Sequence, residues 1–145
     1  MRRLIVTLGA VASVLAVSAC SNGPDVTRPR LEGSVGPAFK HLYAQRLSLL
    51  PAPEATSVTF TPECHRTTPG TNDVGPGADW ICVVSYVDGT GKKQDGKLEV
   101  QVHSNSCWTA GASTKLVGTN TLTNSRGRVE PNPAFEFDGC FDPYA

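Results

Sequence analysis

The stretch WICVVSYV, which runs from Trp80 to Val87, is the strongest β-strand candidate in this chain of 145 residues. It is apolar at nearly every position and rich in β-branched and aromatic side chains, which favour strands. A strand without polar alternation is expected to be covered on both faces. We therefore place it centrally in a sheet, and the turn-forming residues 88–91, Asp-Gly-Thr-Gly, follow it.

The segment after this turn has the alternation of a half-buried strand. Leu98, Val100 and Val102 are separated by polar residues, so one face should be buried and the other wet. Residues 62–79 are rich in proline and glycine and predict a long loop. Further strands are predicted at residues 57–61 and 115–123, with a turn at 124–127 and an aromatic tail at 135–141 that returns to the core.

An amphipathic helix is predicted from Pro37 to about residue 50. Pro37 suits the first turn of a helix, where its missing N–H is no loss, and Pro51 and Pro53 end the helix. His41 falls outside the apolar stripe and is expected in solvent. The stripe repeats at helical spacing through Phe39, Leu42, Tyr43, Leu47 and Leu50.

The apolar stripe of this helix requires a partner surface, and a sheet is the obvious one. One N-terminal helix followed by about four antiparallel strands predicts a single α+β domain over residues 37–145. The alternative fold is a small all-β sandwich or barrel with the helix as an appendage.

The first residues have the pattern of an export signal. Arg2 and Arg3 precede an apolar run, residues 4–17, that is too short for a permanent transmembrane helix of about 20 residues. Val17-Ser18-Ala19-Cys20 resembles the lipobox of bacterial lipoproteins. The resemblance implies that residues 1–19 are a signal peptide and that Cys20 becomes the lipidated first residue. An ordinary secretory signal with a chance cysteine is the alternative, and a twin-arginine signal is disfavoured by the flanking residues.

Residues 20–36 are predicted to be the lipidated cysteine and a flexible tether. Glycine, proline and isolated charges dominate this stretch, which has no apolar periodicity. Such a composition buries too little surface to offset its conformational entropy. An irregular arm packed on the domain is the alternative.

The charge of the chain argues against binding to nucleic acid. Lysine and arginine number 13, as do aspartate and glutamate, and no basic run is longer than the pair Lys92-Lys93. The chain therefore lacks the footprint of nucleic-acid binding and of a polybasic membrane patch. Membrane attachment would rest on the lipid at Cys20, and two or more acyl chains suffice for firm anchoring.

Besides Cys20 the chain has four cysteines, and an even number in an exported chain predicts disulfides. We favour Cys64–Cys82, which would close the predicted loop against the strand at residues 80–87, and Cys107–Cys140, which would fasten the tail. The alternative is a metal site that combines His65 and His103 with Cys64, Cys82 and Cys107. It is disfavoured because metal-site spacings such as Cys-x-x-Cys are absent, so we predict no metal and no cofactor.

Catalytic motifs are not recognisable: the sequence has no Gly-x-Ser-x-Gly, no Ser-x-x-Lys and no phosphate-binding glycine loop. Asp138 and Asp142 flank a Gly-Cys-Phe segment, and a turn is the preferred interpretation over a carboxylate pair or cation site. The residues Trp80, Tyr86 and Trp108 are expected in the core, with a ligand cleft as the alternative.

The C-terminal half carries a second resemblance. Residues 107–110 (Cys-Trp-Thr-Ala), Asn132-Pro133 and residues 135–142 (FEFDGCFD) are similar to a pattern in small uncharacterised lipoproteins of high-GC Gram-positive bacteria. The likeness covers roughly residues 80–142. It supports export, the anchor and the Cys107–Cys140 pairing, and it implies no activity.

These observations favour a lipid-anchored interaction or binding module on the extracytoplasmic face of the cell membrane. Its partner would be an envelope protein, a polymer or a small ligand, and no nucleic acid is expected. An envelope enzyme with a site assembled from scattered residues such as His103, Asp138 and Asp142 is the less favoured alternative. A passive structural lipoprotein is the third.

Overall fold

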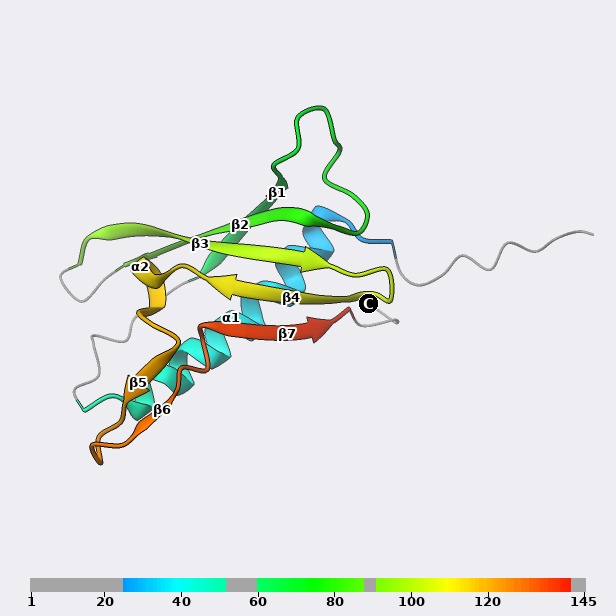
Figure 1. Cartoon of the computed structure of the whole chain (residues 1–145). Coiled ribbons are helices and arrows are strands. Elements are labelled where there is room, and N and C mark those ends of the chain that lie inside the picture. Colours follow the sequence, from blue (N-terminus) through cyan, green and yellow to red (C-terminus); the bar gives the residue numbers. More distant parts are fainter. Residues whose placement is uncertain (1–24, 52–59, 88–90, 142–145) are drawn as a thin grey trace, which may run out of the picture.

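The computed structural model describes residues 25–51, 60–87 and 91–141. Five strands form one antiparallel sheet in the order β1-β2-β3-β4-β7, and β5 pairs with β6 in a separate hairpin (Figure 1). The fold is therefore α+β, as predicted, with one long helix on an antiparallel sheet, although the sheet has five strands instead of about four. The elements are α1 (Arg28–Leu49), β1 (Thr61–Arg66), β2 (Gly77–Val87), β3 (Lys93–Val102), β4 (Cys107–Ala112), α2 (Thr114–Val117), β5 (Thr121–Thr123), β6 (Val129–Pro131) and β7 (Glu136–Cys140).

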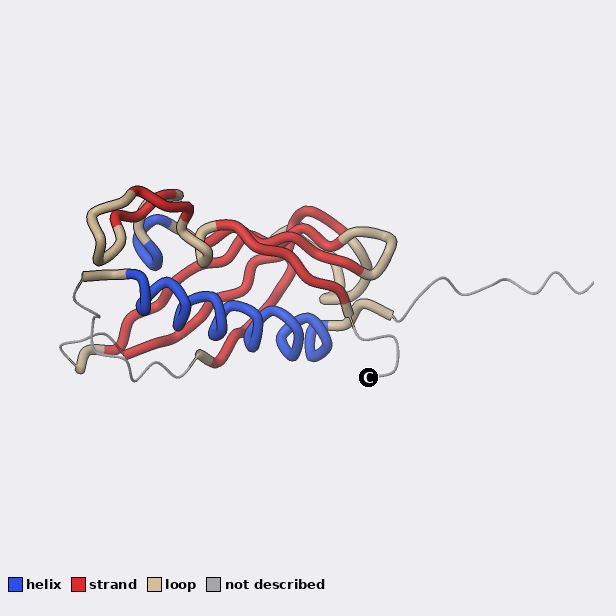
Figure 2. The backbone as a smooth tube through the Cα atoms, turned by 90° about the horizontal axis from the view of Figure 1, so that it is seen from below, coloured by secondary structure: helices blue, strands red, loops and turns tan. Residues whose placement is uncertain are grey.

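Helix α1 crosses one face of the sheet, and the core lies between these two layers (Figures 1 and 2). Residues four apart lie on the same face of a helix, and α1 buries such a stripe. The stripe consists of Leu31, Val35, Phe39, Tyr43 and Leu47. The sheet contributes its inward-facing side chains, including Trp80, Val84, Leu98, Val100 and Trp108.

The helix begins at Arg28 instead of Pro37, so the prediction of a flexible tether is wrong for residues 28–36. Pro29 occupies the first turn, and Pro37 lies inside the helix. The glycines of this stretch suggested flexibility, but Gly36 is buried for a packing reason. A Cβ atom there would lie 2.8 Å from the Pro62 side chain. The signal peptide predicted over residues 1–19 and the lipidated Cys20 lie outside the described residues.

Strand β2 contains the predicted strand at residues 80–87 and starts earlier, at Gly77. Only one of its faces is fully buried, because Trp80, Cys82 and Val84 are buried whereas Ile81 and Val83 are partly exposed. The prediction of two covered faces is therefore wrong. β2 lies between β1 and β3, and β3 occupies the middle of the sheet.

Two other predicted segments differ from the structure. The strand predicted at residues 57–61 falls largely outside the described residues, and β1 begins at its last residue, Thr61, and takes up residues 62–66 of the predicted loop. Residues 115–123 form the end of α2 and then β5, separated by Gly118 with a φ of 78°. Leu116 from α2 fills the space above Gly96, where a Cβ atom would lie 2.6 Å from it.

The half-buried strand, the turn and the aromatic tail are confirmed. β3 alternates as predicted, with Leu98, Val100 and Val102 buried. In the turn at residues 124–127, the Asn124 Oδ1 accepts hydrogen bonds from two backbone N–H groups. The tail forms β7, and Phe137 buries its ring. The turn preferred at residues 138–142 is wrong for residues 138–140, which continue the strand.

The two disulfides, Cys64–Cys82 and Cys107–Cys140, are the pairs that the sequence favoured. Each joins directly opposite residues of neighbouring strands. Their surroundings differ, since Cys64 and Cys82 are fully buried on the helix side, whereas Cys140 is exposed and Cys107 partly exposed. Both therefore act as cross-strand links, one inside the core and one at the surface.

Candidate functional site

The face of the sheet opposite α1 is open to solvent. The smaller elements lie on the helix side: Arg46 of α1 donates to the Val117 carbonyl at 2.9 Å, and the Ser125 N–H donates to the Leu49 carbonyl at 2.9 Å. In the part of the chain that the structure describes, no helix or strand covers the opposite side. The residues that face outward on this side include Glu63, His65, Ile81, Val83, Ser85, Asp95, Lys97, Glu99, Gln101, Thr109, Gly111, Glu136 and Asp138.

A shallow depression of about 580 Å³ lies on the open face over β3, β4 and β7. Its centre is a row of three residues across these strands, Glu99, Gly111 and Glu136. Gly111 opens the floor, because a Cβ atom at this position would meet nothing within 4 Å. We call this feature the acidic depression; its remaining lining residues are Ala78, Val100, Gln101, Thr109, Ala110, Phe137 and Asp138.

The chemistry of the acidic depression is that of a binding surface. Glu99 and Glu136 stand two strands apart, which places their Cα atoms about 10 Å from each other. Asp138 lies in the adjacent row, opposite Thr109. Ionised carboxylates accept hydrogen bonds and donate none. The surface therefore favours partners that donate hydrogen bonds and carry positive charge.

The scattered catalytic candidates are not assembled. Asp138 lines the acidic depression, whereas His103 lines a different groove of about 600 Å³. That groove is formed by residues 25–27, residues 74–76 and the turn between β3 and β4. Asp142 lies outside the described residues. Among the residues that can be placed, the predicted histidine and aspartate thus belong to separate surfaces.

The metal alternative has no free thiol to use in the described part of the chain, because the four cysteines placed there are in disulfides. His65 lies on the open face of β1, and His41 is exposed on α1, as predicted. Within the described ranges, no group of three or more His, Cys, Asp or Glu side chains is placed to hold a metal ion.

The two tryptophans belong to the core, as expected. Trp80 is fully buried and donates from Nε1 to the Gly75 carbonyl at 3.1 Å. Trp108 is 1% exposed and donates from Nε1 to the Ser34 hydroxyl at 2.9 Å. Tyr86 is partly buried against the same core. None of the three lines the acidic depression.

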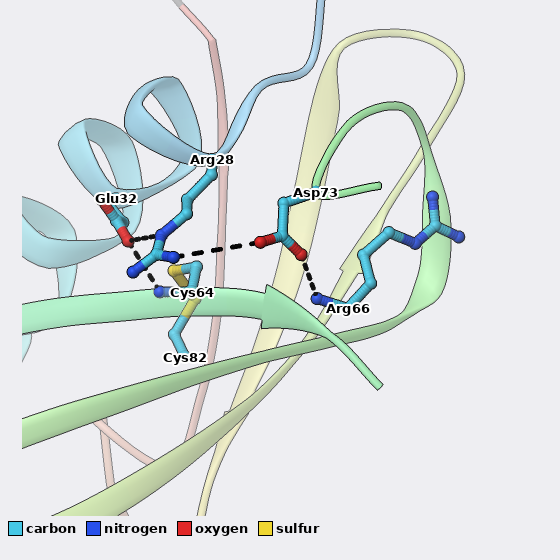
Figure 3. The surroundings of a disulfide bond; sticks show 6 residues. All are labelled: Arg28, Glu32, Cys64, Arg66, Asp73 and Cys82. Carbon is cyan, nitrogen blue, oxygen red and sulfur yellow. Dashed lines mark hydrogen bonds and ion pairs between the residues drawn. A yellow bond between two sulfur atoms is a disulfide. The ribbon is translucent and has the colours of Figure 1, made fainter. Parts of the chain in front are cut away.

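Strand β1, at one edge of the sheet, has no free outward N–H, and Figure 3 shows the two carboxylates that accept from Cys64 and Arg66. The Thr67 N–H donates to the Asp79 carbonyl of β2, so by alternation the N–H groups of residues 62, 64 and 66 point away from β2. Residue 62 is a proline and has no N–H. The Cys64 N–H donates to the Glu32 carboxylate, and the Arg66 N–H donates to the Asp73 carboxylate, both at 2.8 Å.

Ion pairs hold this edge and the loop at residues 67–76 in place. Arg28 contacts Glu32 at 2.9 Å and Asp73 at 3.9 Å, which links the helix to the loop (Figure 3). Arg66 pairs with Asp79 at 2.6 Å and donates from Nη1 to the Val74 and Pro76 carbonyls. The hydrogen bond from Arg66 lowers the pKa of Asp79 from 3.8 to about 2, and the hydrogen bond to Glu32 raises the pKa of Arg28.

Sequence reasoning missed most of the acidic depression. The alternation of β3 placed Glu99 and Gln101 on its wet face, which is a usable indication. The strand β4 was not predicted, so nothing brought Gly111 and Thr109 beside them. The register that adds Glu136 and Asp138 is a long-range property, which periodicity does not encode.

Among the described residues, no helix combines the length and apolar character that crossing a bilayer requires. Comparison of the chain with protein-family models, with curated proteins and with solved structures finds no match.

Proposed function

We propose that this protein is a lipid-anchored binding module of the cell envelope, held to the membrane through Cys20, whose partner docks on the open face. The observation that carries the proposal is the asymmetry of the sheet. One face is sealed by α1, whereas the other presents the acidic depression across three strands.

Two features support an extracytoplasmic location. Disulfides persist in oxidising compartments, and this domain holds two of them. The basic start, the apolar run and the Val17-Ser18-Ala19-Cys20 stretch support export and lipidation. The protein would therefore act on the outer side of the cell membrane.

The shape and chemistry of the open face support binding over catalysis. The acidic depression is shallow, and its ionisable lining residues are the carboxylates Glu99, Glu136 and Asp138. General acid–base and nucleophilic catalysis require a base positioned beside the group that it activates. The predicted candidates His103 and Asp138 lie in separate grooves, so they are not placed to act on one group.

The anchor is tested by fractionating cells that express the Cys20→Ser variant. We expect the wild-type protein in the membrane fraction and the variant in the soluble exported fraction. Equal distribution of both proteins would disprove the lipid anchor and leave the binding surface to be judged separately.

The binding surface is tested by crosslinking in intact cells followed by purification from membranes. The variant Glu99→Gln/Glu136→Gln removes two carboxylates of the acidic depression. The variant Glu63→Gln/Asp95→Asn removes two exposed carboxylates that lie elsewhere on the sheet and serves as the matched control. We expect a crosslinked partner to be lost with the first variant and retained with the second. Retention with both would show that the acidic depression is not the docking surface.

A further inference from the structure

We infer that β7 is a docking edge, where an extended segment of a partner protein with basic side chains at alternate positions adds to the sheet as a further strand. β7 runs along the lower margin of the sheet in Figure 1. The inference rests on the proposed function, because it names the partner class of the same surface.

The hydrogen bonds between β4 and β7 show which way the β7 backbone points. The Ala112 N–H donates to the Phe135 carbonyl at 2.8 Å, and the Phe141 N–H donates to the Ser106 carbonyl at 2.9 Å. Antiparallel pairs alternate between bonded and non-bonded, so the N–H groups of Glu136, Asp138 and Cys140 point away from β4. Of the residues that the structure describes, none accepts a hydrogen bond from these three groups.

The two edges of the sheet are therefore unequal. At β1, one outward N–H is removed by Pro62 and the other two are taken by Glu32 and Asp73. At β7 the corresponding row is open. Exposed edge strands are templates for pairing with another chain, and proteins usually protect them. An edge left open in a sheet whose other edge is closed fits strand addition, which is a recurring mode of peptide recognition.

The negative charge of β7 indicates which side chains the added strand should carry. Glu136 and Asp138 project on the open face from the edge strand itself. If two copies paired antiparallel about Phe137, Glu136 of each would lie opposite Asp138 of the other. Like charges directly opposite are destabilising, so a second copy is disfavoured. Lysine or arginine at alternate positions would instead face these carboxylates across the new pair.

The intervening positions of the added strand face the helix side. There β7 presents Phe137, which is 8% exposed, and next to the end of the strand Phe141, which is 6% exposed. Apolar side chains in the partner would extend this row of aromatic rings. The matching segment thus alternates basic and apolar residues over about 17 Å, the length of a five-residue strand.

The test uses the full exported chain with Cys20→Ser and a short synthetic peptide in which lysine alternates with valine. Fluorescence anisotropy measures binding, and NMR hydrogen exchange follows the amides of Glu136, Asp138 and Cys140. We expect binding, and at least about a tenfold rise in the protection of these amides. A peptide with its alternate amides N-methylated should bind at least about tenfold more weakly, because it cannot pair. A peptide with glutamate in place of lysine should not bind.

Protein variants supply the second arm. Asp138→Pro removes one outward N–H without breaking a bond to β4, and proline is tolerated at such an edge position. Asp138→Asn removes the same charge and keeps the N–H. We expect Asp138→Pro to bind the lysine peptide about tenfold more weakly than Asp138→Asn does.

The outcomes separate the edge from the face. Binding that is indifferent to N-methylation but lost in Glu99→Gln/Glu136→Gln would overturn strand addition and leave the proposed function standing. Sedimentation that shows a dimer with protected β7 amides would assign the edge to a second copy and overturn the basic partner. Absence of any binding would overturn the edge inference, whereas the proposed function is judged by the crosslinking experiment.

Discussion

Replacement of Leu31 by alanine tests whether the first turns of α1 belong to the folded unit. Leu31 is fully buried and lies in the stretch whose composition suggests a flexible tether. Leucine-to-alanine changes at buried sites cost 2–5 kcal/mol, the lost transfer energy plus a cavity. We expect Leu31→Ala to lower the free energy of unfolding by about 3 kcal/mol, which is a large share of the usual 5–15 kcal/mol for a domain.

The assay is urea unfolding followed by tryptophan fluorescence. Trp108 is a direct reporter, because its indole N–H is bonded to Ser34 of the same helical stretch. With an m-value of about 1.5 kcal/mol/M, the loss corresponds to a fall of about 2 M in the urea midpoint. The exposed residue Lys40 gives the matched control, and Lys40→Ala should change stability by less than about 0.5 kcal/mol. If Leu31→Ala behaves like Lys40→Ala, the helix does not pack on the sheet from Arg28.

Three further predictions follow from the surroundings of single groups. Graded dithiothreitol with differential alkylation should open the surface disulfide Cys107–Cys140 before the buried Cys64–Cys82, because thiolate attack requires access; simultaneous opening would contradict this. The Asp79 carboxyl should titrate in NMR near pH 2, and its pKa should rise in Arg66→Gln, although the hydrogen bond from Thr68 continues to lower it. Since its folded pKa is lowered, the pair stabilises the fold above about pH 4, and this contribution is lost as the pH falls toward 2. Gly111→Val should leave stability unchanged or raise it by up to about 1 kcal/mol. It fills the acidic depression and should weaken capture of the partner in the crosslinking experiment; a destabilised protein would show that the floor is not open.

Local patterns were sufficient for several elements of this fold. The alternation of Leu98, Val100 and Val102 gave the middle strand and its wet face, because a strand buried on one side must repeat every second residue. The disulfide pairs were inferred from the need to hold a long loop and a tail. The turn at residues 124–127 follows from the side-chain chemistry of asparagine and the freedom of glycine at positive φ.

Other elements depend on tertiary contacts that no local pattern contains. Gly36 suggests a break in the helix when the sequence alone is considered. In the structure it is a helical residue without a side chain because Pro62 packs against it. The strand β4, with Gly111 and two alanines, has low β-propensity and is stabilised by its neighbours on both sides. The acidic depression depends on the registers of three strands at once. The sequence contains its carboxylates, but it does not reveal that pairing of the strands brings them close together.

The closed edge at β1 limits how many molecules can join through their backbones. A filament in which sheets pair edge to edge needs two free edge strands on every molecule, because each molecule must pair with one neighbour on either side. With Pro62 in place and the Cys64 and Arg66 N–H groups occupied, this margin offers no donor to a neighbour. Molecules of this protein therefore cannot polymerise through their sheet edges, and backbone pairing at β7 ends at a one-to-one stoichiometry.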